Sequence, residues 1–109
     1  MAFDEQLAER MRQQLAKQSG VVEKRMFGGV AFMLNGNMCC GVHKAALMAR
    51  LAPEATDAAL RQPHTRLFDL TGRPMKGWIL VDAEALKTAA QLKRWIDQSV
   101  AYAASLPAK

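Results

Sequence analysis

The chain has 109 residues, half of them hydrophobic, and a net charge of +5. Its length fits one domain, residues 1–109, and its composition is that of a globular protein rather than a disordered or fibrous one. No apolar run approaches the roughly 20 residues of a membrane helix, and the start MAFDEQ lacks the basic and apolar regions of a signal peptide, so we expect a cytoplasmic protein without membrane contact.

The N-terminal segment predicts a helix, because its apolar residues recur every four positions and therefore share one face. These residues are Phe3, Leu7, Met11 and Leu15. Asp4 is placed to cap the start of this helix, and Gly20 could end it in a left-handed conformation.

A hairpin over residues 30–42 is the strongest local signal in the chain. Asn35-Gly36 lies between two apolar runs, and both residues tolerate the positive φ of a two-residue turn. The loop length predicts four facing pairs: Leu34 with Asn37, Met33 with Met38, Phe32 with Cys39, and Ala31 with Cys40. The two predicted faces are Ala31, Met33, Met38, Cys40 and Val42 on one side, and Val30, Phe32, Leu34, Cys39 and His43 on the other. Both faces are apolar, so we expect helices over one and a partner subunit as a candidate cover for the other.

The remaining elements alternate between strands and helices. We expect strands at 46–51, 66–70 and 78–81, a short helix from Pro53 that ends at Pro63, and a final helix at 83–104 capped by Asp82. A short extra strand near 22–26 is also compatible with the sequence. The order α-β-β-β-α-β-β-α with short connections predicts a two-layer α+β fold, in which helices pack on an antiparallel β-sheet.

The cysteines and histidines give little support to a metal or catalytic site. Cys39 and Cys40 are consecutive strand residues, so their side chains should point to opposite faces and cannot grip one metal ion. Only His43 and His64 could add ligands, and neither has a sequence-local partner for acid–base catalysis. We expect no metal, no cofactor and no disulfide, with buried, reduced cysteines; a reactive thiol at the more exposed cysteine is the alternative.

Two glycine-containing segments could contact a ligand. Gly28-Gly29 fits neither a P-loop nor a dinucleotide fingerprint and precedes a strand, so it predicts a bend at the entry to the hairpin. Close approach of a ligand or another backbone is the alternative. The loop GRPMKGW presents Arg73 and Lys76 between glycines beside Trp78 and could meet an anion or a nucleotide. A connecting loop anchored in the core is the simpler interpretation.

The positive charge is concentrated in the middle of the chain. Residues 24–76 carry eight basic residues against three acidic ones. The basic residues are Lys24, Arg25, Lys44, Arg50, Arg61, Arg66, Arg73 and Lys76. This excess suits a nucleic acid, an acidic partner or an anionic ligand, and it equally suits an ordinary solvated surface.

Three of these segments together resemble a known family. KRMFGGVAFMLNGNMCCGV, LMARL and LFDLTGRPMKGWILV are similar to the N-terminal domain of the TfoX/Sxy competence regulators, and the resemblance extends over residues 5–105. It implies a two-layer α+β fold similar to that of type III secretion chaperones, a role of the full-length relatives in regulating competence or transcription, and no catalysis. The full-length regulators also carry a C-terminal helical domain, to which nothing in these 109 residues corresponds.

Three functional hypotheses follow. The first is a non-enzymatic, homodimeric interaction domain that acts through protein contacts. The second is nucleic-acid binding through Lys24, Arg25, Arg50, Arg66, Arg73 and Lys76. The third is a small enzyme or ligand-binding protein with a polar pocket near Gly28, His64 and Arg73. Taken together, the candidate contact residues are Arg25, Gly28, Gly29, Arg50, His64, Arg66, Arg73, Lys76 and Trp78.

Overall fold

The computed structural model of the protein describes residues 3–26, 28–68 and 76–108. Within these residues, six strands form one antiparallel sheet in the order β1-β2-β3-β4-β6-β5. The strands are β1 (Val21–Met26), β2 (Gly29–Leu34), β3 (Asn37–His43), β4 (Ala46–Arg50), β5 (Thr65–Leu67) and β6 (Trp78–Val81). The helices are α1 (Glu5–Gln14), α2 (Thr56–Leu60) and α3 (Ala89–Ser105), with 3₁₀ turns η1 (Pro53–Ala55) and η2 (Ala83–Ala85). The predicted α+β fold is confirmed, and the optional strand near residue 22 is present as β1. Residues 69 and 70 of the predicted fourth strand lie outside the described residues.

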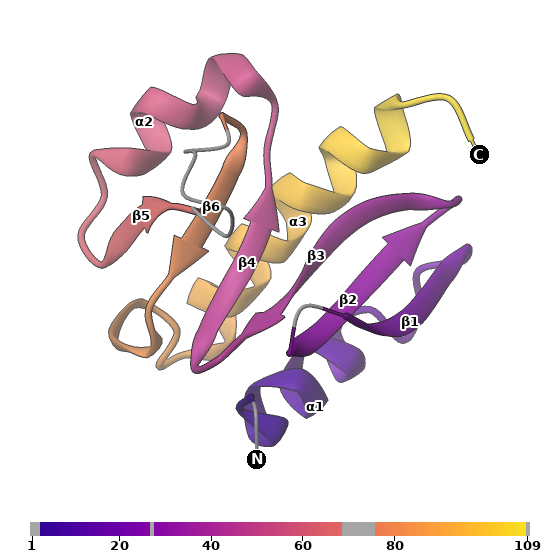
Figure 1. Ribbon diagram of the computed structural model, residues 1–109, viewed down its shortest axis with the longest axis horizontal. Coiled ribbons are helices and arrows are strands. Elements are labelled where there is room, and N and C mark those ends of the chain that lie inside the picture. The colour runs from indigo at the N-terminus through magenta and orange to yellow at the C-terminus, as the bar shows by residue number, and fades with distance from the viewer. Residues whose placement is uncertain (1–2, 27, 69–75, 109) are drawn as a thin grey trace.

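The main core lies between the helices and one face of the sheet. In Figure 1, α1 and α3 lie behind the strands. Met11 of α1 and Trp95 of α3 belong to the same buried cluster as Phe32 of β2. A second, smaller cluster lies on the opposite face and consists of Ala46, Met48, Phe68 and Leu80. Each of these four side chains is only 3% exposed, so this face does not present the open apolar surface that motivated a partner subunit as its cover.

Helix α1 begins where the sequence predicts and ends earlier. The Asp4 carboxylate accepts a hydrogen bond from the backbone N–H of Leu7 at 3.0 Å, which caps the helix. The last helical residue is Gln14. Gly20 has the expected left-handed φ of 85°, but it leads into β1 instead of ending the helix.

Helix α3 starts six residues later than predicted. Asp82 is followed by η2, whereas α3 is capped by Thr88, and the prediction of one helix from residue 83 is wrong. Thr88 and Gln91 form a capping box, in which each side chain accepts from the backbone N–H of the other, at 3.1 and 3.0 Å. A reciprocal cap satisfies two helix-end donors at once, which favours this start over Asp82.

The β2–β3 hairpin keeps the predicted register only beside its turn. Leu34 faces Asn37 and Met33 faces Met38 as predicted, but Phe32 faces Cys40 instead of Cys39. The register shift between Phe32 and Met33 leaves Cys39 as an extra residue in β3, which is a β-bulge. Cys40 and Val42 therefore share the face of Phe32, while His43 lies on the opposite face against Phe68, so the predicted faces of Cys40, Val42 and His43 are wrong.

The bulge places both cysteines in the main core. Cys39 and Cys40 are 1% and 0% exposed and belong to the same cluster, so the prediction that they face opposite sides is wrong. The extra residue interrupts the alternation of side chains that a regular strand imposes. Both thiols are free, and a hydrogen bond with Cys39 together with burial raises the pKa of the Cys40 thiol well above its ordinary value.

Candidate functional site

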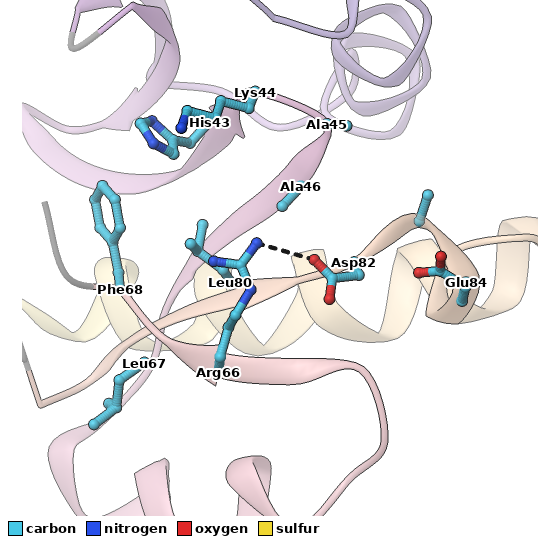
Figure 2. A pocket seen from close by; sticks show the side chains of 11 residues that line it. His43, Lys44, Ala45, Ala46, Arg66, Leu67, Phe68, Leu80, Asp82 and Glu84 are labelled. Carbon is cyan, nitrogen blue, oxygen red and sulfur yellow. Dashed lines mark hydrogen bonds and ion pairs between the residues drawn. The ribbon is translucent and has the colours of Figure 1, made fainter.

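A cavity of about 480 Å³ lies where the β3–β4 turn, β5 and the residues after β6 meet (Figure 2). This volume lies within the roughly 300–1,000 Å³ that small-ligand sites occupy. We refer to it as the end cavity. Its charged and polar lining residues are His43, Lys44, Arg66, Asp82 and Glu84, and its floor includes Ala46, Phe68 and Leu80.

The floor of the end cavity is apolar and carries a histidine beside it. The ring centroids of His43 and Phe68 are 5.2 Å apart in a tilted arrangement. Burial, together with the positive charges of Lys44 and Arg66, lowers the pKa of His43 below its ordinary value of 6.5. The imidazole is therefore neutral at pH 7 and offers one N–H donor and one acceptor nitrogen.

Charged side chains of both signs form the rim of the end cavity. Arg66 donates a hydrogen bond to Asp82 Oδ1 at 3.1 Å, as Figure 2 shows. His64 lies just outside the lining, with its Nδ1 4.0 Å from Glu84 Oε2. Among the residues that the structure describes, no carboxylate lies within ion-pair distance of Lys44. In the rim, the carboxylates of Asp82 and Glu84 each have a partner, whereas the Lys44 ammonium group has no carboxylate partner among the described residues.

Two residues at the end cavity have a left-handed backbone. Lys44 has φ of 56° and His64 has φ of 64°, a conformation that is uncommon for residues other than glycine. Backbone hydrogen bonds hold both in place, from Asp4 N–H to the Lys44 carbonyl at 2.8 Å and from Asp82 N–H to the His64 carbonyl at 2.9 Å. The fold therefore keeps a cation and a histidine in conformations that glycine adopts more easily.

Arg50 and Trp78, both predicted contact residues, meet in an internal stack. The Arg50 guanidinium lies 5.1 Å from the centroid of the Trp78 ring and 5.5 Å from that of Tyr102. It also donates to the Met38 carbonyl at 3.3 Å, just beyond the bulge, where the β3–β4 pairing has ended. These contacts give Arg50 a role in joining β3, β4 and α3.

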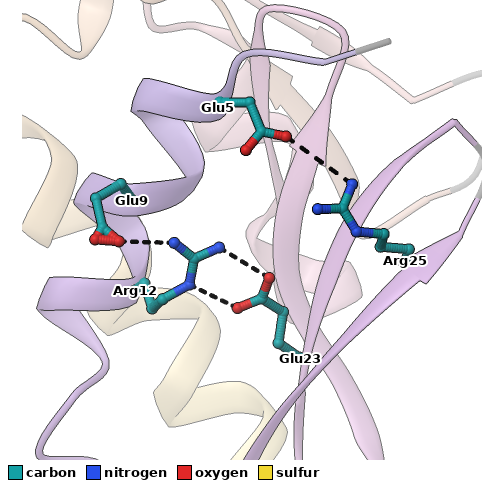
Figure 3. Close-up of polar contacts among 5 residues, drawn as sticks. All are labelled: Glu5, Glu9, Arg12, Glu23 and Arg25. Atoms are coloured by element: carbon teal, nitrogen blue, oxygen red, sulfur yellow. Dashed lines mark hydrogen bonds and ion pairs between the residues drawn. The ribbon is translucent and has the colours of Figure 1, made fainter. Parts of the chain in front are cut away.

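Arg25 lies on β1, on the face of the sheet that α1 covers (Figure 3). Its guanidinium lies 5.2 Å from the centroid of the Phe3 ring and 3.9 Å from Glu5 Oε1. On the same face, Arg12 donates to both carboxylate oxygens of Glu23 at 2.7 and 2.9 Å. Arg25 is therefore part of a surface charge network between α1 and β1.

The glycine pair shapes the β1–β2 turn, as the bend interpretation predicts. Gly28 has a left-handed φ of 71°. A Cβ atom added to Gly29 would collide with the carbonyl oxygen of Val42 on β3. The close approach at Gly29 is thus made by the backbone of the chain itself.

The predicted pocket near Gly28, His64 and Arg73 does not form between its described members. Gly28 lies in the β1–β2 turn and His64 precedes β5, at opposite edges of the sheet. Arg73 lies outside the described residues, and Lys76 is exposed before β6. Of the predicted contact residues that the structure describes, Arg66 lines the end cavity and His64 lies just outside it.

Sequence reasoning missed His43, Lys44, Asp82 and Glu84 as residues of this site. They come together because β6 lies between β4 and β5, an order that strand periodicity does not reveal. The one local signal is the position of Lys44 in the tight connection between two predicted strands, where a left-handed residue is expected.

Within the described ranges, no helix is long and apolar enough to cross a membrane, and no group of three or more His, Cys, Asp or Glu side chains is placed to hold a metal ion. No curated protein and no solved structure matches the chain significantly. The family model of the TfoX N-terminal domain matches residues 13–103, a segment that contains every strand of the sheet and most of α3. The chain therefore belongs to the TfoX N-terminal domain family.

Proposed function

We propose that the chain is a non-enzymatic regulatory domain that acts in the cytoplasm through contact with a protein partner. Membership of the TfoX N-terminal domain family supports a regulatory domain, and the resemblance to competence regulators supports a role in competence or transcription. The observation that carries the proposal is the edge strand β1. Its Val22 is 55% exposed and is the one large hydrophobic side chain exposed within the described residues.

Strand β1 can pair with another strand along its outer edge. It is hydrogen-bonded to β2 only, as its place at the edge of the sheet in Figure 1 shows. In an antiparallel hairpin with a two-residue loop, alternate residues direct their backbone N–H and C=O groups away from the neighbouring strand. Because Met26 pairs with Gly29, these residues are Val21, Glu23 and Arg25. An extended segment of a partner could bond to them by β-augmentation.

A second copy of the chain is the partner that best complements this edge. When two β1 strands pair antiparallel about Lys24, Glu23 of each copy lies opposite Arg25 of the other. Because Glu23 already accepts from Arg12, and Arg25 lies 3.9 Å from Glu5, the pairing extends a network of alternating charge (Figure 3). The two Lys24 side chains meet at the axis, and this repulsion makes the dimer weak and reversible.

Charge reversal combined with analytical ultracentrifugation tests the dimer. We expect Arg25→Glu to weaken self-association, the double variant Glu23→Lys/Arg25→Glu to restore it, and Lys24→Thr to strengthen it. Lys93→Glu on α3 changes charge far from β1 and serves as the control. A wild-type chain and a Lys24→Thr variant that both remain monomeric at tens of micromolar would disprove pairing through β1.

Nucleic-acid binding is the alternative that the charge excess supports. Among the described residues, Arg25, Arg50 and Arg66 are each engaged by groups of the chain itself, so these cations do not form one free stripe. Titration of labelled DNA and RNA at low salt separates the two functions. Protein contact predicts no saturable binding, whereas an affinity that falls linearly with salt on a log–log scale would favour nucleic acid.

The regulatory role is tested in the native host. Deletion of the gene should change the frequency of natural transformation or the level of specific transcripts, and a wild-type copy should restore the original value. An unchanged transformation frequency and transcript profile would overturn the regulatory role without affecting the evidence for self-association.

A further inference from the structure

We propose that the end cavity binds a carboxylate that is attached to an aromatic or branched apolar group. This site is separate from the edge proposed to pair with a partner, because β1 and β5 lie at opposite edges of the sheet. Each proposal can therefore fail without the other.

The nitrogen-bearing side chains of the cavity supply donors for an anion. Figure 2 shows His43, Lys44 and Arg66 around the cavity. Arg66 has five guanidinium N–H groups, and Asp82 is its one hydrogen-bond acceptor among the described residues. The other guanidinium donors, the Lys44 ammonium group and the His43 N–H can bind the oxygens of a carboxylate.

The balance of charge selects a carboxylate over a phosphate. Lys44 and Arg66 bring two positive charges to the cavity, while Asp82 and Glu84 bring two negative charges to the same rim. A phosphate carries almost two charges at neutral pH and would be repelled by both carboxylates. A carboxylate that accepts from Lys44 and Arg66 carries one negative charge and is therefore repelled less by Asp82 and Glu84 than a phosphate would be.

The His43 ring defines the rest of the ligand. Ala46, Phe68 and Leu80 are each only 3% exposed, so the half-buried His43 ring, which packs against Phe68 with centroids 5.2 Å apart, supplies the accessible aromatic face of the cavity. An aromatic ring prefers tilted or offset contacts of this kind. A volume of about 480 Å³ accommodates such a group together with its carboxylate.

Lys44 contributes its cation from a fixed turn. Its φ of 56° belongs to the tight β3–β4 connection, and its carbonyl accepts a hydrogen bond from the backbone N–H of Asp4 at 2.8 Å. No carboxylate among the described residues lies within ion-pair distance of the Lys44 ammonium group, which leaves it available to an anionic ligand.

The test is a titration of the ¹⁵N-labelled protein with 3-phenylpropionate, followed by NMR. We expect saturable shifts at the β3–β4 turn, in β5 and after β6, and much weaker binding of the neutral analogue 3-phenylpropanol. Lys44→Gly and Arg66→Gln should each weaken binding about tenfold, as for loss of a hydrogen bond to a charged group. Asn35→Gly is the matched control, because it makes the same backbone replacement at φ of 53° in the turn at the other end of β3.

Two peptides that end in phenylalanine, one with a free carboxylate and one amidated, identify the source of the carboxylate. Tighter binding of the free peptide than of 3-phenylpropionate supports the C-terminus of a protein, and weaker binding supports a small organic acid. If neither 3-phenylpropionate nor the peptide with a free carboxylate gives saturable shifts up to about 10 mM, the proposal is overturned. Equal binding of the neutral alcohol, or full affinity in folded Lys44→Gly and Arg66→Gln, would overturn it as well.

Discussion

The two glycines of the β1–β2 turn are needed for different reasons, and single substitutions separate them. Gly28 has φ of 71° and no atom within 4 Å of an added Cβ, so Gly28→Ala costs only the left-handed backbone of an alanine, about 1 kcal/mol. In Gly29→Ala, the new Cβ meets the carbonyl oxygen of Val42. Because this neighbour is backbone, β2 and β3 must separate, and we expect a cost of about 3 kcal/mol.

Urea unfolding followed by circular dichroism measures both costs, and each kcal/mol should lower the melting temperature by roughly 4 °C. Asparagine tolerates a left-handed backbone, so Gly28→Asn should recover most of the stability lost in Gly28→Ala. Gly29→Asn should be at least as unstable as Gly29→Ala. Equal losses in the two alanine variants, or a recovery in Gly29→Asn, would refute a steric role for Gly29.

Three further measurements test contacts of the fold. Thr88→Ala removes the capping box of α3 and should lower the free energy of unfolding by about 1 kcal/mol, whereas Thr88→Ser should retain it. Hydrogen bonds from Arg12 lower the pKa of the Glu23 carboxylate below its ordinary value of 4.5. The ion pair therefore stabilises the fold fully at pH values above 4.5, and this stabilisation is lost as the pH falls through the lowered pKa. Glu23→Gln should therefore make the free energy of unfolding depend less on pH on the acid side. The difference should be less than about 1 kcal/mol, because the Arg12–Glu23 pair lies at the surface. A stability–pH curve parallel to that of the wild type would contradict the ion pair. Arg50→Ala should cost about 2 kcal/mol and alter the emission of Trp78, and unchanged emission would contradict the stacking.

The hairpin shows which part of a register the sequence can predict. Asn35-Gly36 determines the turn and hence the pairs next to it, because the φ requirement of those two residues is local. The bulge at Cys39 follows from packing, since it brings Cys40 and Val42 under the helices on the face of Phe32. The residue types of β3 do not indicate this packing, so the predicted faces are wrong from Cys40 onward.

The helix starts and the candidate site show the same limit. Asp82 and Thr88 are both good N-caps, and the reciprocal bond with Gln91 decides between them. At the end cavity, Arg66 was predicted as a contact residue from its charge alone. Its partner Asp82 follows from the position of β6 between β4 and β5, which no local pattern encodes.

The adjacent thiols in the bulge provide a natural reporter of motion at the centre of the sheet. Cys39 and Cys40 are 1% and 0% exposed, so a thiol reagent reacts with them only in molecules whose β3 has transiently separated from the helices. The labelling rate is then the intrinsic reactivity of the thiols multiplied by the equilibrium constant for that opening. Comparison of this rate with global unfolding shows whether the bulged strand opens alone or with the whole domain.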